Sequence, residues 1–111
     1  MGASGSQSGC RLLLVDDSPS YRSALALALS RDPSLLVVGE AGDGAAALEL
    51  VAKLCPDVVL LDLMMPRLNG IETARAILRD HGHQTAVVLL SALARLPGSI
   101  EHREAVAALP A

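Results

Sequence analysis

Apolar runs of strand length alternate with segments of helical pattern along most of this sequence, and that alternation restricts the chain to an α/β fold. Residues 11–15 form a nearly continuous apolar run, and similar runs occupy residues 35–39, 57–61 and 86–90. Continuous apolar runs are typical of strands buried on both faces of a parallel sheet. Because intervening helices connect such strands by right-handed crossovers, we predict a doubly wound parallel sheet between layers of helices.

Cap and stop signals mark the helices between these strands. Ser18 followed by Pro19 indicates an N-cap and a first helical residue, and the helix is expected to stop before Pro33. Asp43 is expected to cap the next helix. The further helices are expected over residues 45–54, 70–79 and 100–109.

Composition narrows the functions open to the chain. Its 111 residues make one domain, and a formal net charge of -3 argues against nucleic-acid binding through bulk charge. Tyr21 is the only aromatic residue, which excludes a base-stacking platform. No apolar run is long enough for a membrane-spanning helix. Because Cys10 and Cys55 are too few for a disulfide scaffold and lack metal-ligand spacing, we expect a reducing, cytoplasmic location.

Three acidic residues follow two of the predicted strands. Asp16 and Asp17 close the first, and Asp62 closes the third. The carboxyl ends of parallel strands share one edge of the sheet, so the carboxylates converge if the two strands are neighbours. Carboxylates this close repel one another unless a cation lies among them, and oxygen ligands suit Mg²⁺. The pattern favours a divalent-metal site, and the alternative is that these acids are helix caps.

Two polar residues lie near this edge. Ser91 closes the fourth predicted strand, and its hydroxyl could donate a hydrogen bond to an oxyanion held at Asp62. The alternative for Ser91 is an ordinary strand-end serine. Arg22, beside the acid pair, is expected to pair with a carboxylate at the surface, a contact that is worth little by itself.

Three segments of the chain resemble the receiver domain of bacterial two-component response regulators. They are LLLVDDS at residues 12–18, PDVVLLDLMMPRLNG at residues 56–70 and VVLLSA at residues 87–92. Their order and separations are similar to those of receivers, and the resemblance covers residues 11–92. It is closest in character to the receivers of chemotaxis methylesterases. Other short segments also occur in receivers attached to helix-turn-helix output domains.

The resemblance implies a flavodoxin-like, three-layer α/β/α fold and a phosphoacceptor role. Asp62 matches the aspartate that accepts a phosphoryl group from the phosphohistidine of a histidine kinase. Asp16 and Asp17 match the acid pair that holds Mg²⁺ together with Asp62 and the main-chain carbonyl of Met64. The implied cofactor is therefore Mg²⁺.

The same resemblance implies further residues and partners. Ser91 matches the hydroxyl residue that senses the phosphoryl group, and Ala92 matches the small residue beside it. The expected partner is a sensor histidine kinase or a phosphotransfer protein, with an output domain outside this chain. The chain itself is expected not to be an enzyme beyond its own phosphorylation and dephosphorylation. No direct contact with nucleic acid or membrane is expected.

Near its C-terminus the sequence departs from the family pattern. We assign residues 1–10 to a flexible N-terminal lead-in and residues 11–111 to an incomplete receiver domain that lacks the usual fifth strand and fifth helix. The lysine that ends the family's fifth strand would fall beyond Ala111, and the only lysine here is Lys53. We expect a fragment of a longer regulator, in which the exposed edge of the fourth strand favours a homodimer.

Two alternatives to phosphoryl acceptance stay open. The missing lysine favours a degenerate, non-phosphorylated receiver that acts only as a protein-interaction module. A metal-dependent phosphatase on a similar sheet would want a second acid two residues after Asp62. That position is Met64, which argues against a phosphatase.

Overall fold

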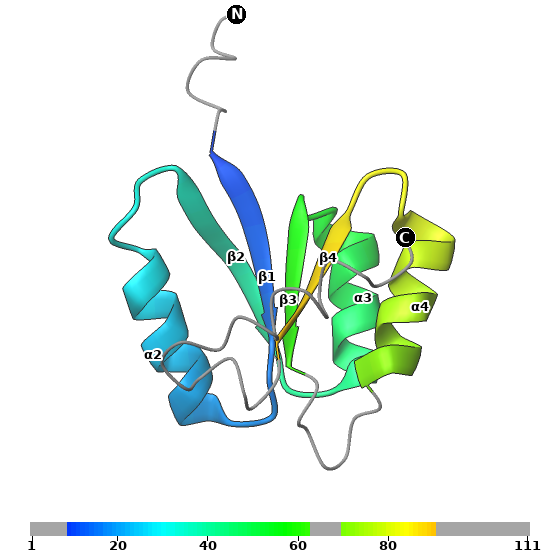
Figure 1. Cartoon of the computed structure of the whole chain (residues 1–111), viewed down its shortest axis with the longest axis horizontal. Helices are drawn as coiled ribbons and strands as arrows, with labels where there is room; N and C mark the ends of the chain where they lie inside the picture. Colours follow the sequence, from blue (N-terminus) through cyan, green and yellow to red (C-terminus); the bar gives the residue numbers. More distant parts are fainter. Residues whose placement is uncertain (1–8, 63–69, 91–111) are drawn as a thin grey trace, which may run out of the picture.

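The computed structural model describes residues 9–62 and 70–90, in which strands and helices alternate (Figure 1). The strands are β1 (Cys10–Val15), β2 (Leu35–Ala41), β3 (Val58–Asp62) and β4 (Ala86–Leu90). The helices are α2 (Pro19–Leu29), α3 (Gly44–Leu54) and α4 (Gly70–His81). All strand pairs are parallel, in the order β2-β1-β3-β4, which confirms the predicted α/β fold. The helix expected over residues 100–109 lies outside the described residues.

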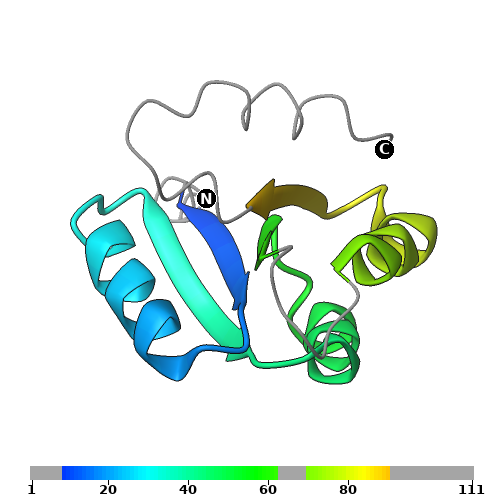
Figure 2. The same ribbon diagram turned by 60° about the horizontal axis from the view of Figure 1, so that its bottom comes forward.

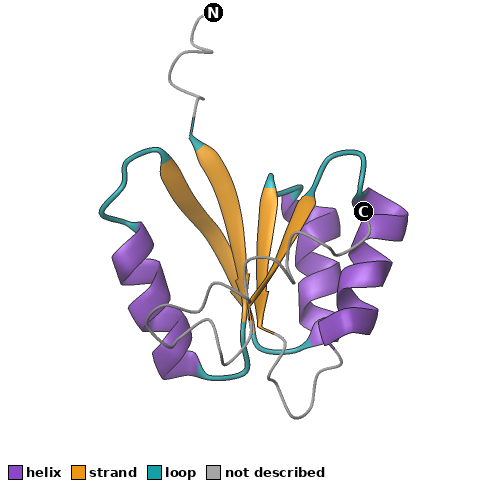
Figure 3. Cartoon of the chain, in the orientation of Figure 1, coloured by secondary structure: helices purple, strands orange, loops and turns teal. Residues whose placement is uncertain are grey.

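The strand order explains why helices cover both faces of the sheet. From β1 the chain moves to β2 on one side, then passes back across β1 to β3 and on to β4. Right-handed crossovers that run in opposite directions place their helices on opposite faces. Accordingly α2 covers one face, while α3 and α4 pack side by side on the other (Figures 1, 2 and 3). The predicted three layers are therefore present in the described part of the chain.

The main apolar core lies between the sheet and the pair α3 and α4. Its members are the buried side chains of Leu13, Val15, Ala41, Ala47, Val51, Val59, Leu61, Ala74, Ile77 and Leu89. By contrast, α2 has no fully buried residue, and its Leu27 is 66% exposed. None of the described helices has the length and apolar character needed to cross a bilayer.

Side-chain caps begin two helices where the sequence predicted them. The Ser18 hydroxyl accepts a hydrogen bond from the Tyr21 N–H at 3.3 Å at the start of α2. The Asp43 carboxylate accepts one from the Ala46 N–H at 2.8 Å at the start of α3. Each cap satisfies a main-chain donor that the first helical turn leaves without a partner.

The last residue of α3 is followed by a left-handed cap that is not a glycine. Cys55 has a φ of 47°, and its N–H donates to the Val51 carbonyl at 2.9 Å. Its own carbonyl accepts a hydrogen bond from Arg11 Nη1 at 2.9 Å, which ties the turn to the start of β1. The cysteine is exposed, and its thiol is free.

A bulge in β2 sets how far this strand reaches. Leu12 pairs with Val37, but Leu13 pairs with Gly39, so Val38 is an extra residue in β2. A Cβ at Gly39 would lie 2.9 Å from Leu54 Cδ1, so a larger residue here would require the Leu54 side chain that packs over it to shift. The strand continues to Ala41, two residues beyond its predicted end, and carries the end of β2 alongside the end of β1.

Candidate functional site

The carboxyl ends of β1 and β3 are neighbours in the middle of the sheet. Val15 pairs with Leu61 in parallel register, so the next residues, Asp16 and Asp62, lie side by side at this edge. The strand order reverses between β1 and β3, and doubly wound sheets bind their ligands at such a reversal. The predicted convergence of the acids required β1 and β3 to be neighbours, and the structure shows that they are.

The acids at this edge differ in burial. Asp16 is 4% exposed and Asp62 is 3% exposed, whereas Asp17 is half-buried. Burying an ionised carboxylate is unfavourable unless hydrogen bonds or an opposite charge compensate for the lost water. Two buried carboxylates on adjacent strands therefore make this edge a favourable place for a cation.

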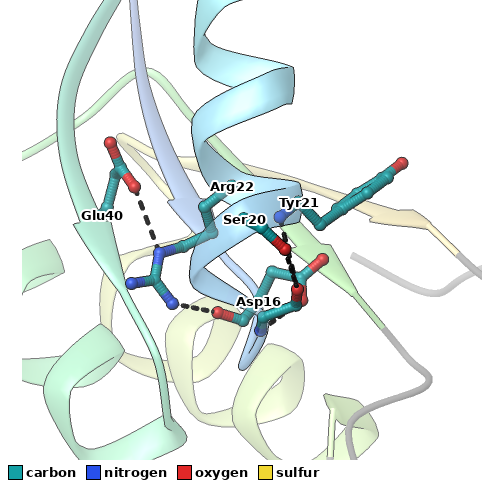
Figure 4. Close-up of polar contacts among 6 residues, drawn as sticks. Asp16, Ser20, Tyr21, Arg22 and Glu40 are labelled. Carbon is teal, nitrogen blue, oxygen red and sulfur yellow. Dashed lines mark hydrogen bonds and ion pairs between the residues drawn. The ribbon is translucent and has the colours of Figure 1, made fainter.

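Every polar group of Asp16 has a separate partner. Its N–H donates to the Ala41 carbonyl of β2 at 3.0 Å. Its carboxylate accepts a hydrogen bond from the Ser18 N–H at 2.9 Å, in the turn that leads into α2. Its main-chain carbonyl accepts one from Arg22 Nη1 (Figure 4). The carboxylate thus holds the turn that leads into α2, whose N-cap is Ser18 rather than Asp16, while it stays at the acidic edge.

Asp17 has no hydrogen-bond or ion-pair partner among residues 9–62 and 70–90. Within the same ranges, no group of three His, Cys, Asp or Glu side chains is arranged to hold a metal ion. The predicted set also includes the carbonyl of Met64, which lies outside the described residues. The magnesium site therefore stays a prediction.

The chemistry of the donor atoms nevertheless fits Mg²⁺. Asp16, Asp17 and Asp62 offer only oxygen ligands at one edge of the sheet. Mg²⁺ takes few protein carboxylates and keeps several of its waters, so it does not need a closed cage of side chains. A sparse acidic edge is compatible with that requirement.

Two other predicted site residues, Ser91 and Ala92, lie outside the described residues. The structure shows that β4 ends at Leu90 and that Leu90 pairs with Asp62. The last residue of β4 therefore lies beside the predicted phosphoacceptor, Asp62.

The sequence predicted an ion pair of Arg22 at this edge but not the partner residue. Arg22 forms an ion pair, as expected, but its partner is Glu40 in β2, with Nε 3.1 Å from Oε1. Glu40 was not among the candidate residues, because its closeness to α2 depends on the bulge and on the pairing of β2 with β1. The second contact of Arg22, with the Asp16 carbonyl, had no signal in the sequence.

The sheet order and the acids at its switch point define a doubly wound α/β protein of the flavodoxin-like class. The sequence profile of the response regulator receiver domain matches residues 12–108. The chain belongs to this family, the receiver domains of two-component systems. The match extends past residue 92, the last residue of the three segments that resemble receivers.

Curated relatives carry this domain within longer proteins. A protein-glutamate methylesterase/protein-glutamine glutaminase of a Nocardioides species is 46% identical over 85 residues, covering 77% of this chain and 23% of that protein. The probable transcriptional regulatory protein NarL of Mycobacterium tuberculosis is 48% identical over 82 residues, covering 74% of this chain and 38% of that protein. The chain thus spans well under half the length of either relative.

Solved structures show the same fold. The response regulator domain of Thermotoga maritima CheB superposes with a TM-score of 0.71 and 37% identity, covering 89% of this chain and 72% of that one. The receiver domain of NarL from Mycobacterium tuberculosis gives a TM-score of 0.70 and 41% identity, covering 88% and 77%.

Proposed function

We propose that this receiver domain accepts a phosphoryl group on Asp62, in a Mg²⁺-dependent reaction, from the phosphohistidine of a sensor histidine kinase or a phosphotransfer protein. The observation that carries the proposal is the position of Asp62. It ends β3, it is 3% exposed, and it lies beside Asp16 where the strand order reverses. Membership of the receiver family supports phosphoryl transfer as the reaction.

In the proposed step an oxygen of the Asp62 carboxylate attacks phosphorus. The bond between phosphorus and the histidine nitrogen breaks, its electron pair stays on the imidazole, and the product is an acyl phosphate on Asp62. Phosphoryl transfer has a loose transition state, so the protein mainly positions the groups. Bound Mg²⁺ would neutralise charge on the acceptor carboxylate and the phosphoryl oxygens. Asp16, Asp17 and the Met64 carbonyl would hold the ion.

Ser91 and Ala92 complete the proposed site. The Ser91 hydroxyl would donate a hydrogen bond to the new phosphoryl oxygens, and the small side chain of Ala92 would leave room for them. We assign the domain no catalysis beyond its own phosphorylation and dephosphorylation. It would act in the cytoplasm and control an output domain outside this chain, like the longer proteins that carry similar receivers.

A second candidate, a receiver that only binds other proteins, is favoured by the position of Lys53. This is the only lysine in the sequence, and it lies exposed in the last turn of α3. Because α3 leads back to the start of β3, its last turn lies at the sheet edge opposite the acids. Lys53 therefore does not replace the lysine that receivers place beside the phosphoryl group.

Intact-mass spectrometry after incubation with acetyl phosphate and Mg²⁺ separates the two candidates. Phosphoryl acceptance predicts the gain of one phosphoryl group, lost in Asp62→Asn and lost without Mg²⁺. Glu49→Gln, which removes an exposed carboxylate of α3, is the matched control and should still form the adduct. A folded wild-type chain that forms no adduct would contradict the proposal and favour the interaction-only receiver.

A further inference from the structure

The guanidinium of Arg22 joins the ends of two strands to the first helix (Figure 4). From α2, Nη1 donates to the main-chain carbonyl of Asp16, directly after β1. Nε donates to Glu40 Oε1 of β2 at 3.1 Å. The side chain of Arg22 is only 18% exposed, so these contacts are partly shielded from water.

We infer that Arg22 is a positioning residue for the acid pair. By holding the Asp16 carbonyl, it fixes the orientation of the peptide between Asp16 and Asp17 and hence the direction in which the Asp17 carboxylate leaves the main chain. The inference deepens the proposed function and rests on it, because Asp17 is one of the proposed magnesium ligands.

The pattern of contacts around Asp17 supports this role. The residue before it is held at its N–H, its carbonyl and its carboxylate. Asp17 has no polar partner of its own in the described part of the chain. Its orientation therefore depends on the preceding peptide, and the Arg22 side chain donates to the carbonyl of that peptide. Partners of this kind, which do not touch the metal, orient ligands and set affinity.

Glu40 and Gly42 keep the guanidinium in place. Glu40 holds the Nε side of the guanidinium by accepting its hydrogen bond. A Cβ at position 42 would lie 3.3 Å from Nη1, so Gly42 leaves the space in which the guanidinium lies. A planar guanidinium can donate to two acceptors at once, whereas a lysine ammonium on a flexible stem holds neither acceptor in a fixed plane.

Charge alone predicts the opposite result from positioning. A cationic guanidinium near the acids repels a divalent cation, so its removal would tighten Mg²⁺ binding if charge were its only effect. If Arg22 acts by orienting the acid pair, its removal weakens binding. If it only stabilises the fold, the folded variant binds Mg²⁺ as the wild type does and only its melting temperature falls.

The test is an NMR titration of the full 111-residue chain with MgCl₂, following the amide signals of Asp17 and Ser18. Arg22→Met keeps most of the apolar stem and removes the donors. We expect its Kd for Mg²⁺ to rise about tenfold. Arg22→Lys should fall between Arg22→Met and the wild type. The matched control is Arg31→Met, which removes an exposed arginine past the far end of α2 and should leave the Kd unchanged.

Each outcome has one meaning. A Kd in Arg22→Met that is unchanged or lower than the wild-type value overturns the positioning role while the proposed magnesium site stands. If Arg22→Met does not fold, Arg22→Lys decides the question by the same comparison. If the wild-type chain shows no saturable response to MgCl₂, the magnesium part of the proposed function fails, and the role of Arg22 fails with it.

Discussion

The hydroxyl of Thr85 donates a 2.7 Å hydrogen bond to the main-chain carbonyl of Pro56, and both residues are buried. Thr85 directly precedes β4, and Pro56 lies just before β3. The bond therefore fastens the beginnings of two adjacent strands, next to the main-chain bond from the Ala86 N–H to the Asp57 carbonyl at 2.9 Å.

Thr85→Val should destabilise the domain without changing its shape. Valine fills the same volume but leaves the buried Pro56 carbonyl without this donor, which costs about 1–3 kcal/mol. Thermal unfolding followed by circular dichroism should show Tm lower by about 4–20 °C. Thr85→Ser keeps the hydroxyl and should lose less. Equal losses in the two variants would contradict the assignment of the effect to the hydroxyl, because Thr85→Ser keeps that group.

Gly82→Ala should loosen the end of α4. A Cβ at this position would clash with the carbonyl oxygen of Leu78, a main-chain atom that cannot move aside by changing a rotamer. The Gly82 N–H also donates to that carbonyl at 3.0 Å. We expect a loss of about 1–3 kcal/mol in urea unfolding. His83→Ala, at the exposed neighbouring position, is the control and should be close to neutral.

Asp43→Ala should lower the free energy of unfolding by about 1 kcal/mol, because α3 loses the acceptor for its Ala46 N–H. Asp43→Asn keeps an oxygen acceptor, so its free energy of unfolding should lie within a few tenths of a kcal/mol of the wild-type value. Urea unfolding of the three proteins measures the difference. A full loss in Asp43→Asn would show that the negative charge, rather than the hydrogen bond, stabilises this helix end.

The pKa of Asp32 lies below its usual value of 3.8 because the Ser34 hydroxyl, and secondly the Ser34 N–H, donate to its carboxylate. A carboxyl whose pKa is lowered by folding adds stability above its unfolded pKa, and that stability is lost as the pH falls through the folded pKa. Ser34→Ala should therefore raise the pKa of Asp32 toward 3.8. An NMR titration of the Asp32 side chain checks this, and an unchanged pKa would contradict the assigned cause.

Asp17→Asn should separate magnesium binding from folding. No described residue loses a polar partner in this variant, so Tm should change by no more than is usual for a surface substitution. The Kd for Mg²⁺ should rise at least tenfold if Asp17 is a ligand, as proposed. Unaltered binding of Mg²⁺ by Asp17→Asn would remove this residue from the site.

Much of the architecture was readable from the sequence because the apolar runs are continuous and well separated. The run over residues 86–90 matches β4 in full, and α2 and α3 begin at their predicted caps. The last two residues of β2 were missed because glutamate is a poor strand residue, yet Glu40 and Ala41 pair with β1. An isolated glycine in a strand pattern is a signal for a bulge, and here it marked one.

The site was less accessible to sequence reasoning than the fold. Acids that follow strands locate one edge of a parallel sheet, and the pairing of β1 with β3 brings Asp16 and Asp62 to neighbouring positions there. Which groups hold these acids depends on contacts between residues far apart in the chain. The hydrogen bond from Arg22 to Glu40 forms only when β2 lies beside β1. No local sequence pattern predicts this bond or the bond from Arg22 to the Asp16 carbonyl.

The three anchors of Asp16 change how alleles of the acid pair should be interpreted in a genetic screen. A substitution at Asp16 also removes the acceptor for the Ser18 N–H and disturbs the start of α2, so a signalling-defective allele there reports on protein abundance as well as on chemistry. Asp17, one residue later, makes no polar contact with the described part of the chain that a substitution would remove. The informative loss-of-signal allele is therefore at position 17, and the same phenotype at position 16 has to be corrected for protein level.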